Sequence, residues 1–208
     1  MSLSQLRFTE LLSAFRSREP TPGGGSASAL GGAVGASLLA MVAALPKPRT
    51  QGIADTERLI VAGARCAAIG DSLAALMDRD SMAYDLVVAA FRLPKSTEEE
   101  QTARGMRIQE ALRSATEAPL EVMRACAEAI GLAAVVAAFG NRNAASDVRV
   151  GLELLRAGLR GAKLNVDVNL ASIKDETFVA AVRREAEHLV AEGEREVSTA
   201  VTRLESEP

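Results

Sequence analysis

The sequence predicts an all-α protein, a bundle of long and mostly antiparallel helices, and three observations support this expectation. No stretch of the 208 residues alternates apolar and polar side chains as a half-buried strand does. Ala, Leu, Arg and Glu dominate, and the apolar residues recur at helical spacing almost throughout. Because neither an internal repeat nor a linker interrupts this pattern, we expect residues 1–208 to form a single domain.

Prolines, glycines and capping residues set the expected helix boundaries. Pro46 and Pro94 each follow a helical stretch, and a proline disfavours helix in the residue before it. A capping box, either Ser96 with Glu99 or Thr97 with Glu100, starts the next helix. We expect helices over about residues 3–18, 26–45, 55–93 with a bend near Gly70, 97–139 with a kink at Pro119, 144–164 and 176–204. Residues 165–175 either continue the fifth helix or break it.

Composition excludes several classes of function. A net charge of -3 and few aromatic residues, 3% with no Trp, argue against general nucleic-acid binding. With His188 as the single histidine, and with Cys66 and Cys126 in Ala-rich helical contexts, we expect neither a metal site nor a disulfide. The first residues lack the pattern of a secretion signal, so we expect a cytoplasmic protein.

The uncharged run from Pro20 to Pro46 is long enough to cross a membrane. Because Ala, Gly and Ser dominate it, we interpret it as a closely packed buried helix and expect no membrane contact. It opens with Pro20-Thr21-Pro22-Gly23-Gly24-Gly25-Ser26, which ends one helix and starts another. The first N–H groups of a helix lack partners and favour negative charge. This loop is therefore either an anion-binding site or a tight turn between helices.

Polar residues within the apolar helical stretches are the other candidates for a functional site. Asp80 and Tyr84, four residues apart, share a helix face, as a functional pair or as a solvated one. Four more polar residues cluster at a helix start and exceed what one N-cap needs: Asn141, Asn143, Ser146 and Asp147. Asn165 and Asn169 indicate a ligand or a helix end, because Asn is unfavourable inside a helix.

Lys47 lies on a stiff Pro-Lys-Pro loop and is either a surface charge or a proton donor. If residues 144–169 form one helix, Asp147 and Asn165 point the same way but lie about 27 Å apart. They cannot both touch the reacting atom of one ligand within one subunit. The ligand is then long, or the groups serve opposite ends, or an antiparallel partner subunit brings them together.

These motifs together resemble the cyclodeaminase/cyclohydrolase family of folate enzymes. The likeness covers nearly the whole chain in order and spacing and rests on the glycine loop, Asp80-Ser81-Met82-Ala83-Tyr84, Gly140-Asn141-Arg142-Asn143, Ser146-Asp147-Val148 and Gly161-Ala162-Lys163-Leu164-Asn165-Val166. The resemblance implies an all-helical homodimer with folate bound near the subunit interface. The deaminase members carry an Asn-Leu-Thr stretch followed by Gly-Lys where this chain reads Ala43 to Thr50. That departure favours the cyclohydrolase.

The resemblance implies hydrolysis of 5,10-methenyltetrahydrofolate to 10-formyltetrahydrofolate, without metal or cofactor, because the amidinium carbon of the substrate is already electrophilic. Asp147 or Asp80 would stabilise the cation, and Lys47 would donate a proton or orient water. The asparagines suit the pterin edge, and the loop from Pro22 to Ser26 suits the glutamate carboxylates or an oxyanion. The alternatives are a formiminotetrahydrofolate cyclodeaminase and a non-catalytic helical dimer that binds folate or another anion.

Overall fold

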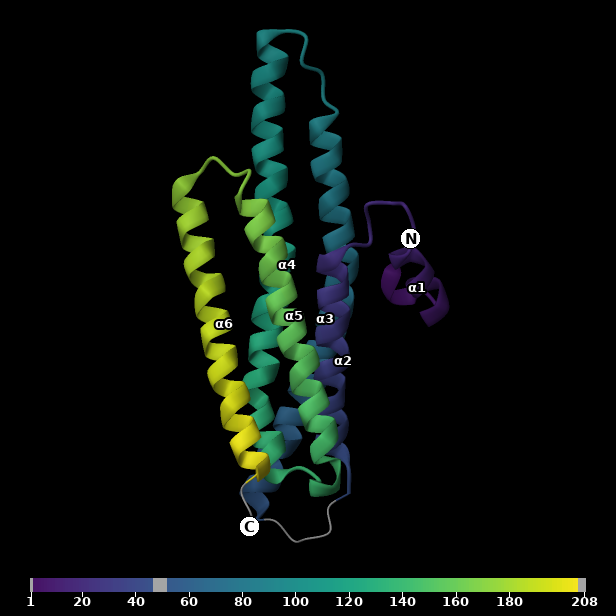
Figure 1. The fold of residues 1–208 in the computed structure, drawn as a ribbon, viewed down its shortest axis with the longest axis vertical. Helices are drawn as coiled ribbons and strands as arrows, with labels where there is room; N and C mark the ends of the chain where they lie inside the picture. Colours follow the sequence, from purple (N-terminus) through teal and green to yellow (C-terminus); the bar gives the residue numbers. More distant parts are fainter. Residues whose placement is uncertain (1, 47–51, 206–208) are drawn as a thin grey trace.

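A computed structural model describes residues 2–46 and 52–205 and places the described chain in helices, which confirms the all-α prediction (Figure 1). The order is η1 (Leu3–Gln5), α1 (Phe8–Phe15), α2 (Gly24–Ala44), α3 (Ile53–Phe91), α4 (Glu98–Phe139), η2 (Arg142–Ala144), α5 (Ala145–Leu170) and α6 (Glu176–Glu205). Successive long helices run in opposite directions along the bundle, as the sequence predicts (Figure 1).

The bundle is built around α2 and α4. Helix α2 packs along both α3 and α5, while α4 packs against α3, α5 and α6. The two longest helices, α3 and α4, continue past the others as an antiparallel hairpin, and α1 lies to one side of the bundle (Figure 1). This arrangement places the start of α2 against the second half of α3 and the end of α5.

Small residues let α2 approach its neighbours closely, as expected for its Ala- and Gly-rich sequence. A Cβ atom on Gly35 would lie 2.6 Å from the carbonyl oxygen of Gly151, and one on Gly32 would lie 2.6 Å from Sγ of Cys126. Helices α2, α3 and α4 are each long and apolar enough to cross a membrane by length and composition, with 44% of each apolar window buried inside the bundle. The absence of membrane contact stays a prediction.

The helix boundaries differ from the expected ones at several points. Helix α1 covers only Phe8–Phe15, and α2 begins at Gly24, two residues earlier than predicted. Helix α4 uses the Thr97–Glu100 capping box and passes through Pro119 without ending. Helix α5 runs on to Leu170, so the asparagines near its end do not break it.

Candidate active site

A pocket of about 290 Å³ lies where the start of α2 meets α3, α4 and α5. Its lining combines the glycine loop with polar side chains from α3 and α5: Pro20, Thr21, Gly23, Gly24, Gly25, Asp80, Tyr84, Val87, Ala115, Asn165, Val168 and Asn169. Three of the sequence motifs that predicted a site, far apart along the chain, therefore meet in one place. Pro22 lines an adjoining hollow of about 500 Å³, together with Asp78 and Ser81.

Asp80 is the carboxylate of this pocket, and it lies directly against the first turn of α2. The Ser26 hydroxyl donates to Asp80 Oδ2 at 2.9 Å, and the Ser26 backbone N–H also bonds this carboxyl. Gly25 leaves room for it, because a Cβ there would lie 2.6 Å from Asp80 Cγ. The anion at this helix start is therefore the side chain of Asp80 itself. Ser26 is fully buried, so it holds Asp80 and does not face a ligand.

Burial raises the pKa of Asp80, and the two hydrogen bonds from Ser26 oppose part of that rise. Burial disfavours the charged form of a carboxyl because water no longer solvates it. A carboxyl of this kind takes up and releases a proton closer to neutral pH than an exposed aspartate does. Asp80 is thus the side chain of this pocket best suited to proton transfer.

Asn165 and Asn169 bring amide groups to the pocket from the last turns of α5. The Asn165 amide donates to the carbonyl of Gly161 at 2.9 Å, one turn back in its own helix. The Asn169 amide donates to the carbonyl of Ala115 in α4, also at 2.9 Å. Within a helix that carbonyl would accept from residue 119, but Pro119 has no N–H. Asn169 therefore supplies the hydrogen bond that Pro119 cannot make.

The second polar cluster of the sequence lies at the opposite end of α5, as its eighteen-residue spacing predicts. The Asn141 amide donates to the carbonyl of Pro46 at 2.6 Å, and its oxygen accepts from the Asn143 backbone N–H at 3.0 Å. Asn143 and Ser146 are exposed, and Asp147 is half-buried. The structure does not bring these four residues to Asp80 within one chain. Lys47 lies outside the described residues.

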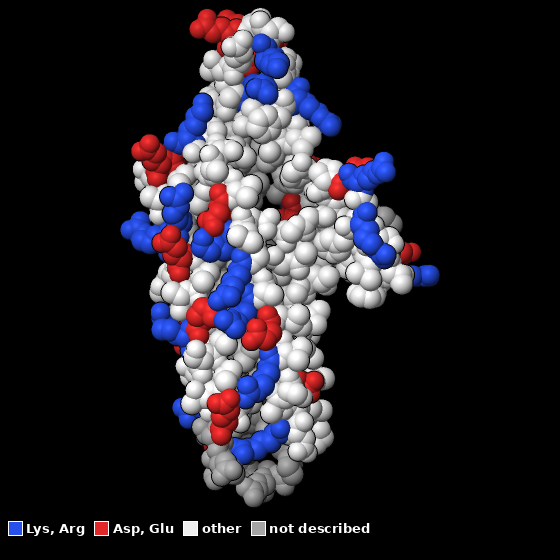
Figure 2. Space-filling view, viewed as in Figure 1, with Lys and Arg blue, Asp and Glu red and all other residues white. Residues whose placement is uncertain are grey.

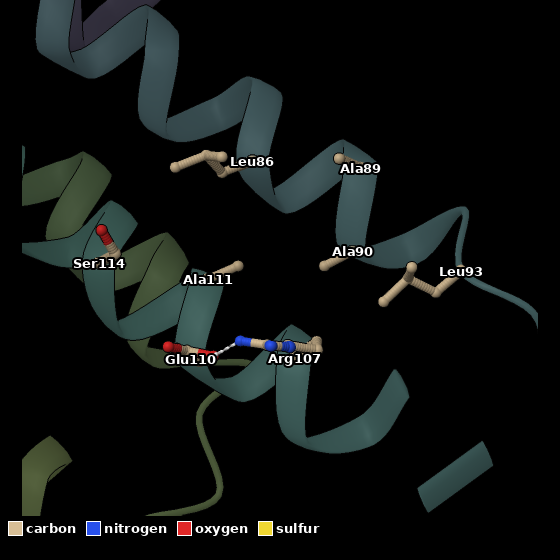
Figure 3. A pocket seen from close by; sticks show the side chains of 8 residues that line it. All are labelled: Leu86, Ala89, Ala90, Leu93, Arg107, Glu110, Ala111 and Ser114. Atoms are coloured by element: carbon tan, nitrogen blue, oxygen red, sulfur yellow. Dashed lines mark hydrogen bonds and ion pairs between the residues drawn. The ribbon is translucent and has the colours of Figure 1, made fainter. Parts of the chain in front are cut away.

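An apolar groove between α3 and α4, on the hairpin beyond the other helices, offers a contrast (Figure 3). It measures about 380 Å³ and is lined mainly by Leu and Ala side chains, with the Arg107–Glu110 ion pair at 2.8 Å on its edge. Both charged side chains of that pair are well exposed. The groove lacks a half-buried carboxylate such as Asp80, so we place the candidate active site in the pocket at the start of α2.

Several pocket residues were missed in the sequence. Val87 lies one further turn along the Asp80–Tyr84 face, and Val168 lies between the two asparagines, so helical spacing could have found both. Ala115 carried no comparable signal, because its role depends on a contact with a distant helix. In the described part of the chain no three His, Cys, Asp or Glu side chains form a group that could hold a metal ion. The metal-free site stays a prediction.

Comparison with known proteins gives consistent matches over most of the chain. Residues 7–188 match the family described as formiminotransferase-cyclodeaminase. A methenyltetrahydrofolate cyclohydrolase from Methylorubrum extorquens is 41% identical over 184 residues, which cover 87% of each chain. The formimidoyltransferase-cyclodeaminase of Sus scrofa is 32% identical over 91% of this chain, and the match spans 35% of that longer protein.

A solved structure extends the agreement to three dimensions. The crystal structure of a formiminotetrahydrofolate cyclodeaminase from Thermotoga maritima superposes with a TM-score of 0.82 at 29% identity and covers 98% of both chains. Sequence and structure thus agree along nearly the whole length of the bundle. The chain belongs to the formiminotransferase-cyclodeaminase family.

Proposed function

We propose that this protein hydrolyses 5,10-methenyltetrahydrofolate to 10-formyltetrahydrofolate in the cytoplasm. The observation that carries the proposal is Asp80, a half-buried carboxyl with a raised pKa among uncharged amides in a pocket. The 41% identity to a methenyltetrahydrofolate cyclohydrolase supports this substrate over others. A negative charge in such a pocket suits a substrate that carries a delocalised cation.

Asp80 is proposed to move the proton in both halves of the reaction. Its ionised form accepts a proton from water while the water oxygen bonds to the bridging carbon, which quenches the amidinium charge and leaves a neutral carbinolamine. The same proton then passes to N5 as the bond between N5 and the carbon breaks. The new hydroxyl group loses its proton to solvent and becomes the formyl carbonyl on N10. One water is consumed and one proton is released.

The two asparagine amides and Tyr84 are proposed to orient the folate. Asn165 and Asn169 each use an amide N–H on a backbone carbonyl, and each keeps an acceptor oxygen suited to the donors of the pterin edge. Tyr84, which is 41% exposed at the pocket, offers a ring surface for the substrate. The proposal uses no metal or cofactor, since the substrate supplies its own activating charge. Lys47 is proposed as a further proton donor.

We also propose that two copies pair along α5. Helix α5 carries a stripe of apolar and small residues, each at least partly exposed, at alternating spacings of four and three: Val150, Leu154, Ala157, Gly161, Leu164 and Val168. This is the spacing of a helix–helix seam, and its small central residues allow close approach. The neighbouring face of α2 also carries few charges, unlike that of α6 (Figure 2). An apolar stripe of this length suits a second helix better than water.

The stripe is symmetric about Leu159, so an antiparallel second copy would set Val150 opposite Val168. In that register Asp147 of the partner subunit falls opposite position 171, beside Asn169 and the mouth of the pocket. The pairing would thus bring the two polar clusters together across the interface, although one chain holds them at opposite ends of α5. The homodimer and the contribution of Asp147 rest on this symmetry and on the spacing.

The activity is tested by incubating the purified protein with each of two substrates. We expect loss of the near-ultraviolet absorption of methenyltetrahydrofolate well above the buffer-catalysed rate, and no ammonia from formiminotetrahydrofolate. Asp80→Asn is the matched inactive control. Ammonia release would instead establish the cyclodeaminase, which the structural match to such an enzyme makes the second candidate. Turnover of neither substrate would leave a folate- or anion-binding dimer. Unchanged turnover in Lys47→Ala would remove that lysine from the mechanism.

The dimer is tested by sedimentation and by mixing two variants, each of which impairs a different part of the proposed shared site. Unfolding and refolding Asp80→Asn together with Asp147→Asn should give heterodimers with one intact site, and so about a quarter of wild-type activity. Each variant refolded alone is the control. A monomeric mass at micromolar concentration, or no recovery on mixing, would contradict the pairing without affecting the assignment of Asp80.

A further inference from the structure

The hydroxyl group of Ser26 has more hydrogen-bond acceptors within reach than it has hydrogens. Ser26 is fully buried, and its Oγ lies 2.9 Å from Asp80 Oδ2 and 3.1 Å from the carbonyl oxygen of Met77. A third neighbour, the Ser81 hydroxyl, lies 3.3 Å away and can donate as well as accept. A serine has one O–H, so Ser26 can donate to Asp80 or to Met77 but not fully to both.

We propose that Ser26 is a positioning residue whose hydroxyl turns between Asp80 and the Met77 carbonyl as Asp80 loses and regains its proton. When Asp80 is ionised, the Ser26 O–H points to the carboxylate, and Ser26 Oγ accepts from Ser81. When Asp80 holds a proton, that proton is donated to Ser26 Oγ, and the Ser26 O–H turns to Met77. The catalytic meaning of this inference rests on the proposed function.

Because Ser26 is buried, its hydroxyl needs the Met77 carbonyl as an alternative acceptor when Asp80 is protonated. A buried polar group that loses its hydrogen-bond partner destabilises the state in which it is left unpaired. If Ser26 could only donate, a proton on Oδ2 of Asp80 would set two hydroxyl hydrogens against each other at 2.9 Å. The Met77 carbonyl provides an alternative acceptor for the Ser26 O–H. Ser26 Oγ is then free to accept the proton of Asp80, and both hydrogens have an acceptor. Both forms of Asp80 are then fully hydrogen-bonded on this side.

The groups that surround Asp80 leave Ser26 as its main hydrogen-bond partner in the described chain. The pocket faces of α2, α4 and α5 bring glycines, Ala115, Asn165 and Asn169, none of which carries a charge. From α3, Tyr84 lines the same pocket, and Asp78 and Asp85 line the adjoining hollow. The Asp78 carboxylate is bonded by Ser2, Leu3 and Ser4, and on α5 Lys163 pairs with Asp167 at 2.6 Å.

The first test is the pKa of Asp80, followed by the ¹³C shift of its labelled carboxyl and assigned with Asp80→Asn. Hydrogen bonds to a charged group outweigh those to a neutral one, so Ser26→Ala should raise this pKa by about one unit. Ser28→Ala is the matched control, since the Ser28 hydroxyl also sits in the first turns of α2 but donates to the carbonyl of Gly24. Ser28→Ala should leave the value unchanged. An unshifted Asp80 in Ser26→Ala would overturn the proposal.

The two positions of the hydroxyl are separated by infrared difference spectra between acid and neutral pH. In the wild type the protonated Asp80 donates to Ser26, and loss of that acceptor in Ser26→Ala should move its C=O stretching band to higher frequency. An unmoved band would mean that Ser26 serves only the ionised form, and the turning hydroxyl would be wrong. If Ser26→Ala does not fold, the ¹³C measurement is made on Ser81→Ala instead. Loss of the Ser81 hydroxyl should raise the pKa of Asp80 by less than Ser26→Ala would. An unshifted pKa in Ser81→Ala would overturn the proposal.

Activity then separates this inference from the proposed function. In Ser26→Ala the acid limb of the kcat/KM profile should move to higher pH by the same amount as the pKa measured by ¹³C, while Ser28→Ala keeps the wild-type profile. A shifted pKa and band in a protein that turns over no folate would uphold the behaviour of Ser26 and overturn only the enzymatic assignment. A shifted pKa with an unmoved acid limb would contradict the link between Ser26 and catalysis.

Discussion

The two polar clusters on α5 occupy opposite ends of one helix, and their surroundings differ. At the end near Asn165, four helices and the glycine loop enclose Asp80, whose pKa burial raises. At the end near Asp147, the Asn141 side chain joins its own turn to the end of α2 through Pro46. The first cluster surrounds a carboxyl that, we propose, moves a proton. The second cluster ties loops together and is proposed to complete the pocket of a partner subunit.

The difference shows that polar residues alone do not make a site. Both clusters contain an aspartate and two asparagines. What distinguishes them is the packing of α2, whose glycines let Asp80 lie against a helix start while the rest of the helix excludes water.

Asp80→Asn should have the largest effect. Asn keeps the size and the acceptor oxygen but cannot take a proton from water, so kcat should fall by about 10²–10⁴-fold. Asp147→Asn, at the other end of α5, should cost only about tenfold, because that group is proposed to stabilise charge and not to move the proton. Steady-state kinetics with methenyltetrahydrofolate measures both. Equal losses in the two variants would mean that the pocket of one chain does not hold the whole proton-transfer machinery.

Gly25→Ala should be the next most damaging change. The added Cβ would lie 2.6 Å from Asp80 Cγ, so the carboxylate must move away from Ser26. We expect kcat/KM to fall by about 10–100-fold, the loss of one or two well-placed hydrogen bonds. Gly24→Ala is the matched control, since its Cβ would meet the Asn165 amide at an ordinary 3.6 Å. A larger loss in Gly24→Ala would show that the loop acts on the ligand and not through Asp80.

Asn169→Ala tests the bond that joins α5 to α4. It leaves the buried carbonyl of Ala115 without its donor, which should lower the free energy of unfolding by about 1–3 kcal/mol. In a Pro119→Ala background the backbone N–H of residue 119 can serve that carbonyl, so the same substitution should cost less there. Urea unfolding of the four proteins completes the cycle. If Asn169→Ala lowered the free energy of unfolding equally in both backgrounds, Asn169 would not be replacing the missing N–H of Pro119.

The sequence predicted the helices better than it predicted the partners of the pocket. Helical spacing and the prolines located the long helices, and the spacing of Asp147 and Asn165 was enough to separate the two clusters. The end of α5 was left open because Asn disfavours helix interiors, yet Asn165 and Asn169 are accommodated by carbonyls at Gly161 and Ala115. The Ser26–Asp80 and Asn169–Ala115 bonds each span 54 positions. Local propensity carries no information about such pairs, because tertiary packing alone brings them together.

The smallest expected effect is on thermal stability. Burial raises the pKa of Asp80, so the folded protein binds its proton more tightly than the unfolded chain does. The stabilisation from this proton is fully present below the pKa of the unfolded chain and is lost as the pH rises through the folded pKa. Asp80→Asn cannot ionise, so at pH 7 its Tm should exceed that of the wild type by about 1–3 °C. Calorimetry should show this advantage vanish at acid pH. An advantage of Asp80→Asn that persisted at acid pH would come from packing, and the contrast between the two ends of α5 would no longer rest on a buried charge.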